Sequence, residues 1–359
     1  MGLFNSLKQQ AFDMAKEHAM KQIEQKFGSA AAGMISGGGG GGGGGGSNHK
    51  VTQTEYEANK PQELRKDIRM LSGCQDHQTS ADVSNVSSFQ LPDPCGRAGG
   101  ALTSTLLKVL YADEKSSNED LSFTEVLEKV REFLQESGYE QIPQLSSMNP
   151  IDVKTTFDLV PHTKRGTKRA VMIGINYVGD NPGELSGCWN DVGNMKNYIM
   201  DVHGFEEENI VVLLDDGNHT EPTYENIINA YKTIVSQSED GDCIFLHYSG
   251  HGTKIRDDDG GEEGDGYDEA LCPRDFQSAG MIRDDDLFDI LVKPLADGVH
   301  MFSLMDCCHS GSIMDLPYSF KGDGNETEMH LNPGVNIEMF IQQNSGKLFE
   351  FMQQQLMGN

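Results

Sequence analysis

Positive charge is scarce in this chain of 359 residues. It holds 28 Lys and Arg residues against 56 Asp and Glu residues, which gives a formal net charge of -28 at pH 7. Nucleic acid binding requires a basic surface that neutralises phosphates, so this composition excludes a nucleic-acid-binding protein. The acidity suits calcium ions or peptides rich in Lys and Arg, and the alternative is that it merely keeps the protein soluble.

The sequence also lacks CxxC cysteine pairs and long apolar runs. The seven cysteines include no CxxC pair, and an odd number cannot form a complete set of disulfides within one chain. No apolar run is long enough to span a bilayer, and the N-terminus lacks the charged start and short apolar core of a secretory signal. We therefore expect a soluble protein in the reducing cytoplasm.

Residues 1–63 are expected to lie outside the folded body. Residues 1–30 have the pattern of an amphipathic helix, and Gly2 with Ser6 matches the N-myristoylation pattern. Together these features predict peripheral membrane contact, and the alternative is a partner-binding or coiled-coil helix. Ten consecutive glycines at 37–46 then form a flexible tether. The apolar stripe of the helix comprises Phe4, Leu7, Ala11, Ala15, Ala19, Ile23 and Phe27.

Ordered structure is predicted from residue 64 onward, in two units. The first unit, 64–160, contains a strand at 67–72, helices at 99–112 and 122–136, and an extended segment at 141–145. After a basic connector at 161–169, the second unit, 170–320, alternates strands at 170–175, 210–214, 242–247 and 299–304 with helices at 191–202, 223–235 and 285–291. Such alternation predicts an α/β fold with a central, mostly parallel β-sheet flanked by helices. Residues 321–359 form a tail with a helix at 335–356, which docks either on the core or on a partner.

Two short motifs follow apolar runs in the second unit and carry reactive side chains. Tyr-Ser-Gly-His-Gly occupies 248–252 and Asp-Cys-Cys-His-Ser-Gly occupies 306–311. Reactive groups collect at the carboxyl ends of parallel strands, so we expect the histidine and a cysteine to meet there. An imidazole can take the thiol proton and return it to a leaving amine, while the flanking glycines free amide groups to bind an oxyanion. The pattern predicts a cysteine hydrolase with either Cys307 or Cys308 as its nucleophile.

These motifs and several others resemble those of metacaspases, caspase-like cysteine peptidases that cleave after Arg or Lys. The family's large-subunit-like domain is matched at residues 171–177, 185–192, 248–252, 267–268, 283–286 and 307–315. Its small-subunit-like domain is matched at residues 71–82 and 141–147. Here the small-subunit-like part precedes the large one, an order that resembles the type III metacaspases of algae. The resemblance implies a caspase-like fold over residues 65–320.

The resemblance also implies a role for each motif residue. Cys308 is the nucleophile, His251 is the general base and acid, and the amides of Gly252 and Cys308 form the oxyanion hole. Two carboxylates in a partly desolvated pocket favour a guanidinium or ammonium group and reject an acidic side chain, so caspase specificity for Asp is not expected. The residues that would line this primary specificity pocket are Cys188, Asp191, Ser249 and Asp306.

Activation by calcium is a further implication of the resemblance, at ligand positions that correspond to Asp268, Asp284, Asp285 and Asp315. A hard cation with flexible coordination is bound by oxygen ligands, here drawn from several loops. The acidic stretch 257–269 has no EF-hand spacing, so the fold would assemble the site, and residues 257–265 are otherwise a solvated acidic loop. Because Asp315 lies seven residues after Cys308, we expect calcium to act as a switch that orders the active-site loop rather than as a Lewis acid.

The connector offers Lys and Arg bonds to such an enzyme, at Lys164, Arg165, Lys168 and Arg169. It is interpreted either as an autocleavage site exposed between the two units or as a basic linker paired with the acidic body. We expect a monomeric, calcium-dependent cysteine endopeptidase that acts on proteins or peptides with Arg or Lys before the scissile bond. The alternatives are a calcium-responsive scaffold without proteolytic activity and a related caspase-like peptidase of different specificity.

Overall fold

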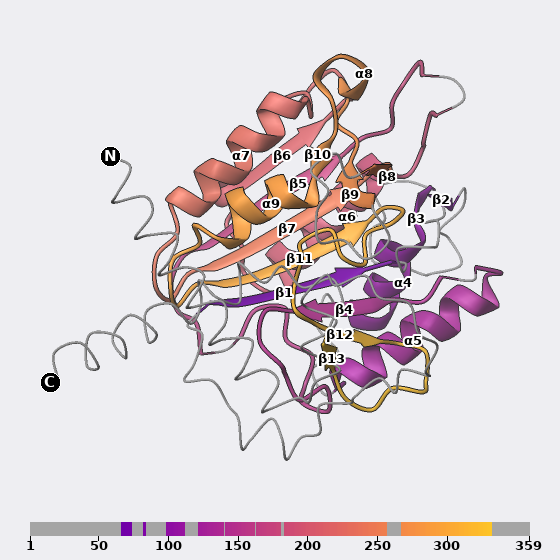
Figure 1. Ribbon diagram of the computed structural model, residues 1–359, viewed down its shortest axis with the longest axis vertical. Coiled ribbons are helices and arrows are strands. Elements are labelled where there is room, and N and C mark those ends of the chain that lie inside the picture. The colour runs from indigo at the N-terminus through magenta and orange to yellow at the C-terminus, as the bar shows by residue number, and fades with distance from the viewer. Residues whose placement is uncertain are drawn as a thin grey trace, which may run out of the picture.

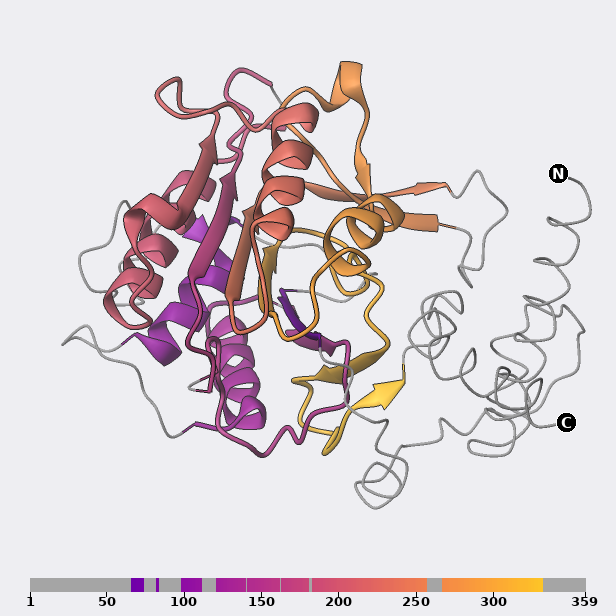
Figure 2. The ribbon, with the colours of Figure 1, turned by 90° about the vertical axis from the view of Figure 1, so that its left-hand side faces the viewer.

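A computed structural model describes residues 66–73, 82–83, 98–111, 121–139, 141–161, 163–180, 183–256 and 267–331 of the chain. These residues form one large β-sheet with helices packed on both of its faces, together with two small sheets (Figure 1, Figure 2). The α/β class and the mostly parallel central sheet predicted from the sequence are confirmed. The predicted N-terminal helix, the glycine tether, most of the acidic stretch and the C-terminal helix lie outside the described residues.

The central sheet has eight strands in the order β13-β12-β4-β1-β11-β7-β5-β6 (Figure 1). The five strands that run parallel are β1 (Asp67–Ser72), β11 (His300–Asp306), β7 (Cys243–Ser249), β5 (Lys168–Gly174) and β6 (Ile210–Leu214). Antiparallel pairing then adds β4 (Gln144–Ser147), β12 (Tyr318–Lys321) and β13 (His330–Leu331). The chain leaves β11 and returns as β12 on the far side of β1 and β4. Strands β1 and β4, which precede the connector in the sequence, therefore lie between other strands rather than at an edge of the sheet.

Both faces of the inner parallel strands β5, β7 and β11 are buried, because their apolar side chains alternate between two hydrophobic clusters. On β5, Met172 belongs to one cluster, while Val171 and Ile173 belong to the other. On β7, Phe245 packs in the first cluster and its neighbour Leu246 in the second. Burial on both faces explains why these strands are continuous apolar runs in the sequence.

Helices cover each face of the sheet. The first face is covered by α4 (Ala101–Leu110), α5 (Phe123–Glu136) and α6 (Cys188–Asp201). The opposite face is covered by α7 (Tyr224–Ser236), by α9 (Asp284–Leu287) and by the π-helical turn η3 (Phe288–Val292) that continues α9 (Figure 2). Among the described helices, none has both the length and the apolar character needed to cross a bilayer.

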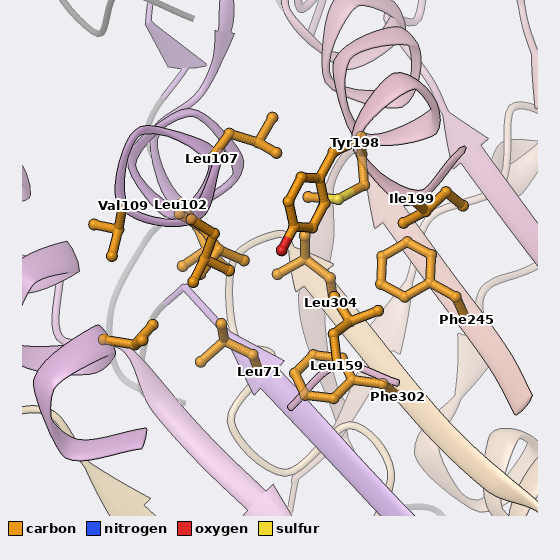
Figure 3. Packing of buried hydrophobic residues seen from close by; sticks show 14 of the residues in the cluster. Leu71, Leu102, Leu107, Val109, Leu159, Tyr198, Ile199, Phe245, Phe302 and Leu304 are labelled. Atoms are coloured by element: carbon orange, nitrogen blue, oxygen red, sulfur yellow. The ribbon is translucent and has the colours of Figure 1, made fainter. Parts of the chain in front are cut away.

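The first cluster joins the N-terminal part of the fold to the part that follows the connector. Figure 3 shows Leu102 and Leu107 of α4 on one side of this cluster and Ile199 of α6 on the other. Between them lie Tyr198 of α6 and Leu304 of β11. A buried side chain of this size stabilises the fold by about 1.5–3 kcal/mol. The two predicted units therefore share one core.

Local sequence signals set the start of α5. Ser122 caps the helix, since its Oγ accepts from the Glu125 amide at 3.2 Å while the Glu125 carboxylate accepts from the Ser122 amide at 2.8 Å. Such a capping box stabilises a helix by about 1 kcal/mol. The buried face of the helix is formed by Phe123, Val126, Leu127, Val130 and Leu134, which recur at helical spacing.

Within the described residues, the predicted helices differ from the observed ones by up to three residues at their ends. The helix predicted at 191–202, for example, is Cys188–Asp201, and two others differ further. The helix predicted at 99–112 begins at Ala101, because Gly99–Gly100 forms strand β3 and pairs with β2 (Asp82–Val83). The helix predicted at 285–291 is α9 followed by η3. A separate antiparallel sheet contains β8 (Gly252–Arg256), β9 (Tyr267–Leu271) and β10 (Ile282–Arg283), and the short helical turns are η2 (Glu207–Asn209) and α8 (Phe276–Ala279).

The connector is shorter than predicted, because β5 begins at Lys168. The side chains of Lys164 and Lys168 each donate to a backbone carbonyl at 2.5 Å, and Arg169 pairs with the buried carboxylate of Asp242. Of the four basic connector residues, Arg165 alone is exposed. Three of the four basic side chains of the connector are therefore bound to the body of the fold.

Candidate active site

The two sequence motifs end neighbouring strands in matching register. Ser249, the last residue of β7, pairs with Asp306, the last residue of β11. His251 and Cys308 each follow two residues later, so both leave the sheet at the same edge. The carboxyl ends of two parallel strands thus bring together a histidine and a cysteine that lie far apart in the sequence.

Gly252 lies directly against the turn that carries Cys308. A Cβ atom on Gly252 would stand 2.1 Å from the carbonyl oxygen of Cys308 and 3.2 Å from the Sγ of Cys307. No side chain fits in this space, so glycine is needed for the two turns to approach each other so closely. The structure brings together the residues predicted for the catalytic pair and the oxyanion hole, which are His251, Gly252 and Cys308.

Burial distinguishes the two adjacent cysteines. Cys307 is 1% exposed and belongs to the hydrophobic cluster beneath α7, whereas Cys308 is partly exposed. A nucleophile has to be reached by its substrate, so the geometry favours Cys308, as the family resemblance implied. The next residue, His309, has a φ angle of 51°, a conformation that few non-glycine residues adopt and that clusters at functional turns.

A backbone carbonyl orients the imidazole of His251. The Nε2 of His251 lies 2.6 Å from the carbonyl oxygen of Gly183. A carbonyl can only accept a hydrogen bond, so this contact assigns the proton to Nε2 and leaves the lone pair on Nδ1. Nδ1 is then the nitrogen that can take the proton of a thiol. Sequence reasoning missed Gly183, because a residue that acts through its carbonyl leaves no side-chain signal.

A second histidine, His247, belongs to the interior. It lies within β7 and is fully buried, and burial lowers its pKa to about 3, so the ring stays neutral. Its Nε2 lies 3.3 Å from the Oγ1 of Thr103 on α4. Of the two histidines near the end of β7, His251 is the partly exposed one, at the sheet edge from which Cys308 also emerges.

The residues predicted for the specificity pocket are all buried. The exposed fraction is 0% for Asp191, 2% for Ser249 and 4% for both Asp306 and Cys188. The Oγ of Ser249 donates to the Asp191 carboxylate at 2.7 Å. A Cβ atom on Gly100 would lie 2.2 Å from an oxygen of Asp306 and 2.9 Å from an oxygen of Asp191, so the two carboxylates flank the same glycine. The structure therefore gathers both carboxylates of the predicted pocket at one place.

The N-terminus of α4 binds both carboxylates, a contact that sequence reasoning missed. The Gly100 amide donates to the two oxygens of Asp191 at 2.9 and 2.8 Å, and the Thr103 amide donates to Asp306 at 2.8 Å. Amide groups in the first turn of a helix, together with the helix dipole, stabilise negative charge. The Gly-Gly pair before α4 signals a helix start but does not identify these partners. Residues that precede the connector thus complete the pocket.

The four predicted calcium ligands lie in the acidic region beside the active-site loop. Burial, together with the nearby carboxylates of Asp268 and Glu269, raises the pKa of Asp284 to about 7. Asp268 is paired with Arg283. An excess of buried carboxylate suits a hard divalent cation, but among the described residues no three Asp, Glu, His or Cys side chains are placed to hold a metal ion. The predicted ligands are Asp268 on β9, Asp284 and Asp285 at the start of α9, and Asp315 in the loop before β12.

Glu269, on β9, links the acidic region to the loop that follows the nucleophile. Its carboxylate pairs with Lys254 at 3.0 Å and accepts from the Oγ of Ser312 at 2.7 Å. The amide of Glu269 in turn donates to Asp284 at 2.9 Å. This buried glutamate was not among the predicted site residues, and its position next to Asp268 in the sequence was the one available signal.

The same loop is held from its other side by β4. The side chains of Gln144 and Ser146 both donate to the carbonyl oxygen of Gly311, at 2.9 and 3.2 Å. Gly311 lies three residues after the nucleophile. Strand β4, which precedes the connector, therefore helps to fix the loop that carries Cys308.

Comparison with known proteins identifies the family. Residues 168–317 match the family described as "Metacaspase, peptidase C14 domain", and residues 7–153 match the "Caspase domain". The chain is 60% identical over 287 residues to Metacaspase III c of Phaeodactylum tricornutum, an alignment that covers 80% of this chain and 85% of that protein. It is 44% identical over 168 residues to Metacaspase-1A of Neurospora crassa, which covers 46% of this chain and 37% of that protein. It is also 44% identical over 192 residues to Metacaspase-1 of Eremothecium gossypii, which covers 51% of this chain and 42% of that protein.

The extent of these matches differs between the relatives. The chain spans less than half the length of the two fungal proteins but most of the Phaeodactylum protein. An alignment over 80% of this chain includes residues on both sides of the connector. The resemblance inferred from the motifs is therefore confirmed, and it agrees with the strand order and with the two motifs at one sheet edge. The chain belongs to the metacaspase family of caspase-like cysteine peptidases.

Proposed function

We propose that the chain is a calcium-activated cysteine endopeptidase that cleaves after Arg or Lys, with Cys308 as nucleophile and His251 as general base and acid. The observation that carries this proposal is the matched register of β7 and β11, which places both residues at one edge of the sheet. Membership of a peptidase family supports the proteolytic reaction. Protein or peptide substrates would approach this edge from the solvent side, where Cys308 is partly exposed.

In this proposal, the reaction begins with proton transfer from the Cys308 thiol to Nδ1 of His251. The thiolate attacks the carbonyl carbon of the scissile peptide, and the amides of Gly252 and Cys308 bind the negative charge that develops on its oxygen. The imidazolium returns the proton to the leaving amine, which leaves a thioester on Cys308. A water molecule that is deprotonated by His251 then hydrolyses the thioester and frees the thiol.

Asp191 and Asp306 support a preference for a basic side chain before the scissile bond. Both carboxylates are buried around Gly100, where each accepts hydrogen bonds from backbone amide or hydroxyl groups. A guanidinium or ammonium group would add opposite charge, whereas an acidic side chain would bring a third carboxylate into a buried place. Substrates with Arg or Lys at this position are therefore expected to react, and substrates with Asp are not.

Calcium is proposed as the activator because the acidic region concentrates buried carboxylates next to the active-site loop. The ion would be held by Asp268, Asp284, Asp285 and Asp315 and would supply positive charge where these side chains repel one another. No three ligating side chains meet among the described residues. Binding would therefore require these side chains to move together, and such a movement is what a switch needs.

Autoprocessing is proposed at Arg165. Lys168 and Arg169 lie within β5, where cleavage would require the sheet to open, and Lys164 is bound through its side chain. Arg165 is exposed, as a cleavage site has to be. Mass spectrometry of the intact chain after calcium addition tests this site. A chain that stays in one piece, or that is cut elsewhere in the connector, contradicts the proposal.

The test of the proposed function is hydrolysis of paired fluorogenic peptides that end in Arg or in Asp, with calcium and with chelator. The intact chain is compared with Cys308→Ala and with the matched control Cys307→Ala. We expect calcium-dependent cleavage after Arg, lost in Cys308→Ala and retained in Cys307→Ala. Cleavage after Asp would contradict the pocket assignment, and loss in Cys307→Ala alone would contradict the nucleophile. No cleavage by folded protein in calcium would favour a calcium-responsive scaffold.

A further inference from the structure

Two buried tyrosines surround the backbone of His251. Tyr177 lies in the loop after β5 and Tyr248 lies near the end of β7, and their side chains are among the largest that are fully buried. Their hydroxyl groups approach each other to 3.3 Å. Neither tyrosine has a part in the reaction described above. Their contacts therefore have to explain why two phenols are buried at this position.

The hydrogen bonds of the two hydroxyls can be assigned because each carries one proton. The Tyr177 hydroxyl lies 2.6 Å from the Cys272 carbonyl, to which it donates, and it accepts from the His251 amide at 3.0 Å. The Tyr248 hydroxyl donates to the His251 carbonyl at 2.9 Å, the shorter of its two contacts with carbonyls. The amide and the carbonyl of His251 are therefore each held by one phenol.

The side chain of His251 is held as well. The centroid of the Tyr177 ring lies 4.6 Å from the centroid of the imidazole ring, with an angle of 33° between the two ring planes. The imidazole is also hydrogen-bonded to the Gly183 carbonyl. A Cβ atom on Gly250 would lie 3.0 Å from the Tyr248 hydroxyl and 3.2 Å from the Tyr177 hydroxyl. The glycine that precedes His251 thus gives both phenols room to approach its backbone.

The backbone of Tyr177 supports a functional reason for this arrangement. Its φ angle is 53°, in the left-handed region that a bulky residue adopts only at an energetic cost. Such conformations persist where the surroundings hold them in place, and they cluster at functional sites. Burial also raises the pKa of both phenols well above the ordinary value, so their hydroxyls keep the protons that these hydrogen bonds need.

We infer that Tyr177 and Tyr248 are positioning residues that fix His251 for proton exchange with Cys308. The inference rests on the proposed role of His251 as general base. Proton transfer requires donor and acceptor within about 2.6–3.2 Å of each other, and a small displacement of one partner lowers the rate steeply. Loss of the Tyr177 hydroxyl would leave the His251 amide without this acceptor and would widen the range of positions that the imidazole samples.

The test compares Tyr177→Phe with Tyr231→Phe as a matched control. Tyr231, on α7, is also fully buried, but its hydroxyl has no hydrogen-bond partner among the described residues. Both changes remove one buried hydroxyl and keep the ring. We expect kcat for an Arg peptide to fall about 10- to 100-fold in Tyr177→Phe with KM changed less than about twofold, because proton transfer is impaired and substrate contacts are kept. The control should keep both constants.

A second measurement needs no substrate. Iodoacetamide labelling of Cys308, followed by mass spectrometry of its peptide across pH, reports the proton shared by Cys308 and His251. Burial raises the pKa of the neighbouring Cys272 thiol to about 12, so this thiol stays protonated over the range used. We expect the acid limb of the Cys308 profile to move toward higher pH in Tyr177→Phe, toward that of His251→Ala, and to stay in place in the control.

Equal kcat values and equal labelling profiles in Tyr177→Phe and Tyr231→Phe would overturn the inference. If Tyr177→Phe does not fold, the same labelling measurement is made on Tyr248→Phe. An unshifted profile in that variant would also overturn the inference. His251→Ala separates this failure from a failure of the proposed function. If His251→Ala keeps full activity, the assignment of the general base is wrong, whatever the tyrosine variants show.

Discussion

The sheet edge that carries the catalytic pair and the acidic region beside it are built in different ways. At the edge, strand register sets the positions, since Ser249 pairs with Asp306 and the reactive residues follow two residues later. In the acidic region, the carboxylates of Asp268, Glu269 and Asp284 are buried close to one another, and the pKa of Asp284 is raised to about 7. At the edge, backbone groups such as the Gly183 carbonyl and the Thr103 amide hold the side chains of His251 and Asp306. The second region gathers carboxylates, two of which are also paired with Arg283 and Lys254.

Under the proposed function, this difference predicts that the reaction and its activation by calcium are separable. Glu269 joins the two regions through its contact of 2.7 Å with Ser312 in the active-site loop. Changes at the sheet edge should therefore remove the reaction without removing the response to a cation. Changes in the acidic region should alter that response and spare the basal chemistry.

The largest effect is expected from His251→Ala. Without the base, hydrolysis of an Arg peptide should fall by at least about 10⁴-fold, because the thiol keeps its proton and the leaving amine receives none. The rise in melting temperature on calcium addition should be kept, because none of the proposed ligands is changed. Melting curves of this variant that no longer respond to calcium, while those of the intact chain do, would show that the two regions are not separable.

Gly100→Ala is expected to have the next largest effect, on the pocket. Gly100 has φ -68° and ψ 144°, angles that alanine also adopts, so the added Cβ acts through its contact with Asp306 and Asp191 rather than through backbone strain. We expect kcat/KM for an Arg peptide to fall about 30- to 100-fold, a cost of about 2–3 kcal/mol. Labelling of Cys308 should be unchanged, because the catalytic pair lies outside the pocket. A slower labelling reaction would mean that the variant disturbs the whole edge.

The raised pKa of Asp284 predicts how the free energy of unfolding depends on pH in the absence of calcium. Its folded pKa of about 7 lies well above the value of 3.8 for an aspartate free in solution, so its ionisation costs more in the folded than in the unfolded state. Its effect appears as pH rises from about 4 to about 7, and the free energy of unfolding should fall by about 3 kcal/mol across this range. Denaturant unfolding in chelator at pH 5, 6, 7 and 8 measures this fall.

Two further conditions sharpen the result for Asp284. Asp284→Asn should flatten the pH dependence whatever its absolute stability, because the titrating group is gone. Calcium, under the proposed function, should restore stability at pH 8, since a cation favours the ionised carboxylate. An unchanged pH dependence in Asp284→Asn would assign the fall in stability to another group.

Ser312→Ala is expected to have the smallest effect, because it removes one hydrogen bond at the junction between the two regions. Loss of the contact with the buried Glu269 carboxylate should lower the free energy of unfolding by about 1 kcal/mol and activity a few-fold. The control is Ser303→Ala, since the buried Ser303 hydroxyl has no partner among the described residues. If both variants lose the same stability and activity, the junction has no role of its own.

Strands with a clear apolar pattern were predictable from the sequence. The strands predicted at 67–72 and 210–214 are β1 and β6 with the same bounds. β6 is a continuous apolar run, whereas β1 alternates the polar residues Asp67 and Arg69 with the buried residues Ile68 and Met70. The ends of parallel strands then indicate where reactive residues gather. Pattern reasoning alone left Cys307 and Cys308 as alternatives, and the difference in their burial requires the packed fold.

Contacts between distant segments could not be predicted in this way. The Gly100 amide and Asp191 are 91 residues apart, and His251 and the Gly183 carbonyl are 68 residues apart. Both partners act through backbone groups, which every residue possesses, so the sequence contains no mark of them. The same reason hid the two tyrosines, since a buried phenol reads as ordinary core until its hydrogen bonds are known.

The position of β1 and β4 between β11 and β12 changes what a cut in the connector would do. Each of these two strands is bonded on both sides within the sheet, and α4 reaches the carboxylates of the pocket from the same N-terminal part. After cleavage at Arg165, the two fragments would stay associated under native conditions and would separate only on denaturation. If the two fragments were synthesised as separate polypeptides, they would have to associate before the sheet could be completed. Continuity of the chain would therefore govern the rate of assembly rather than the final fold.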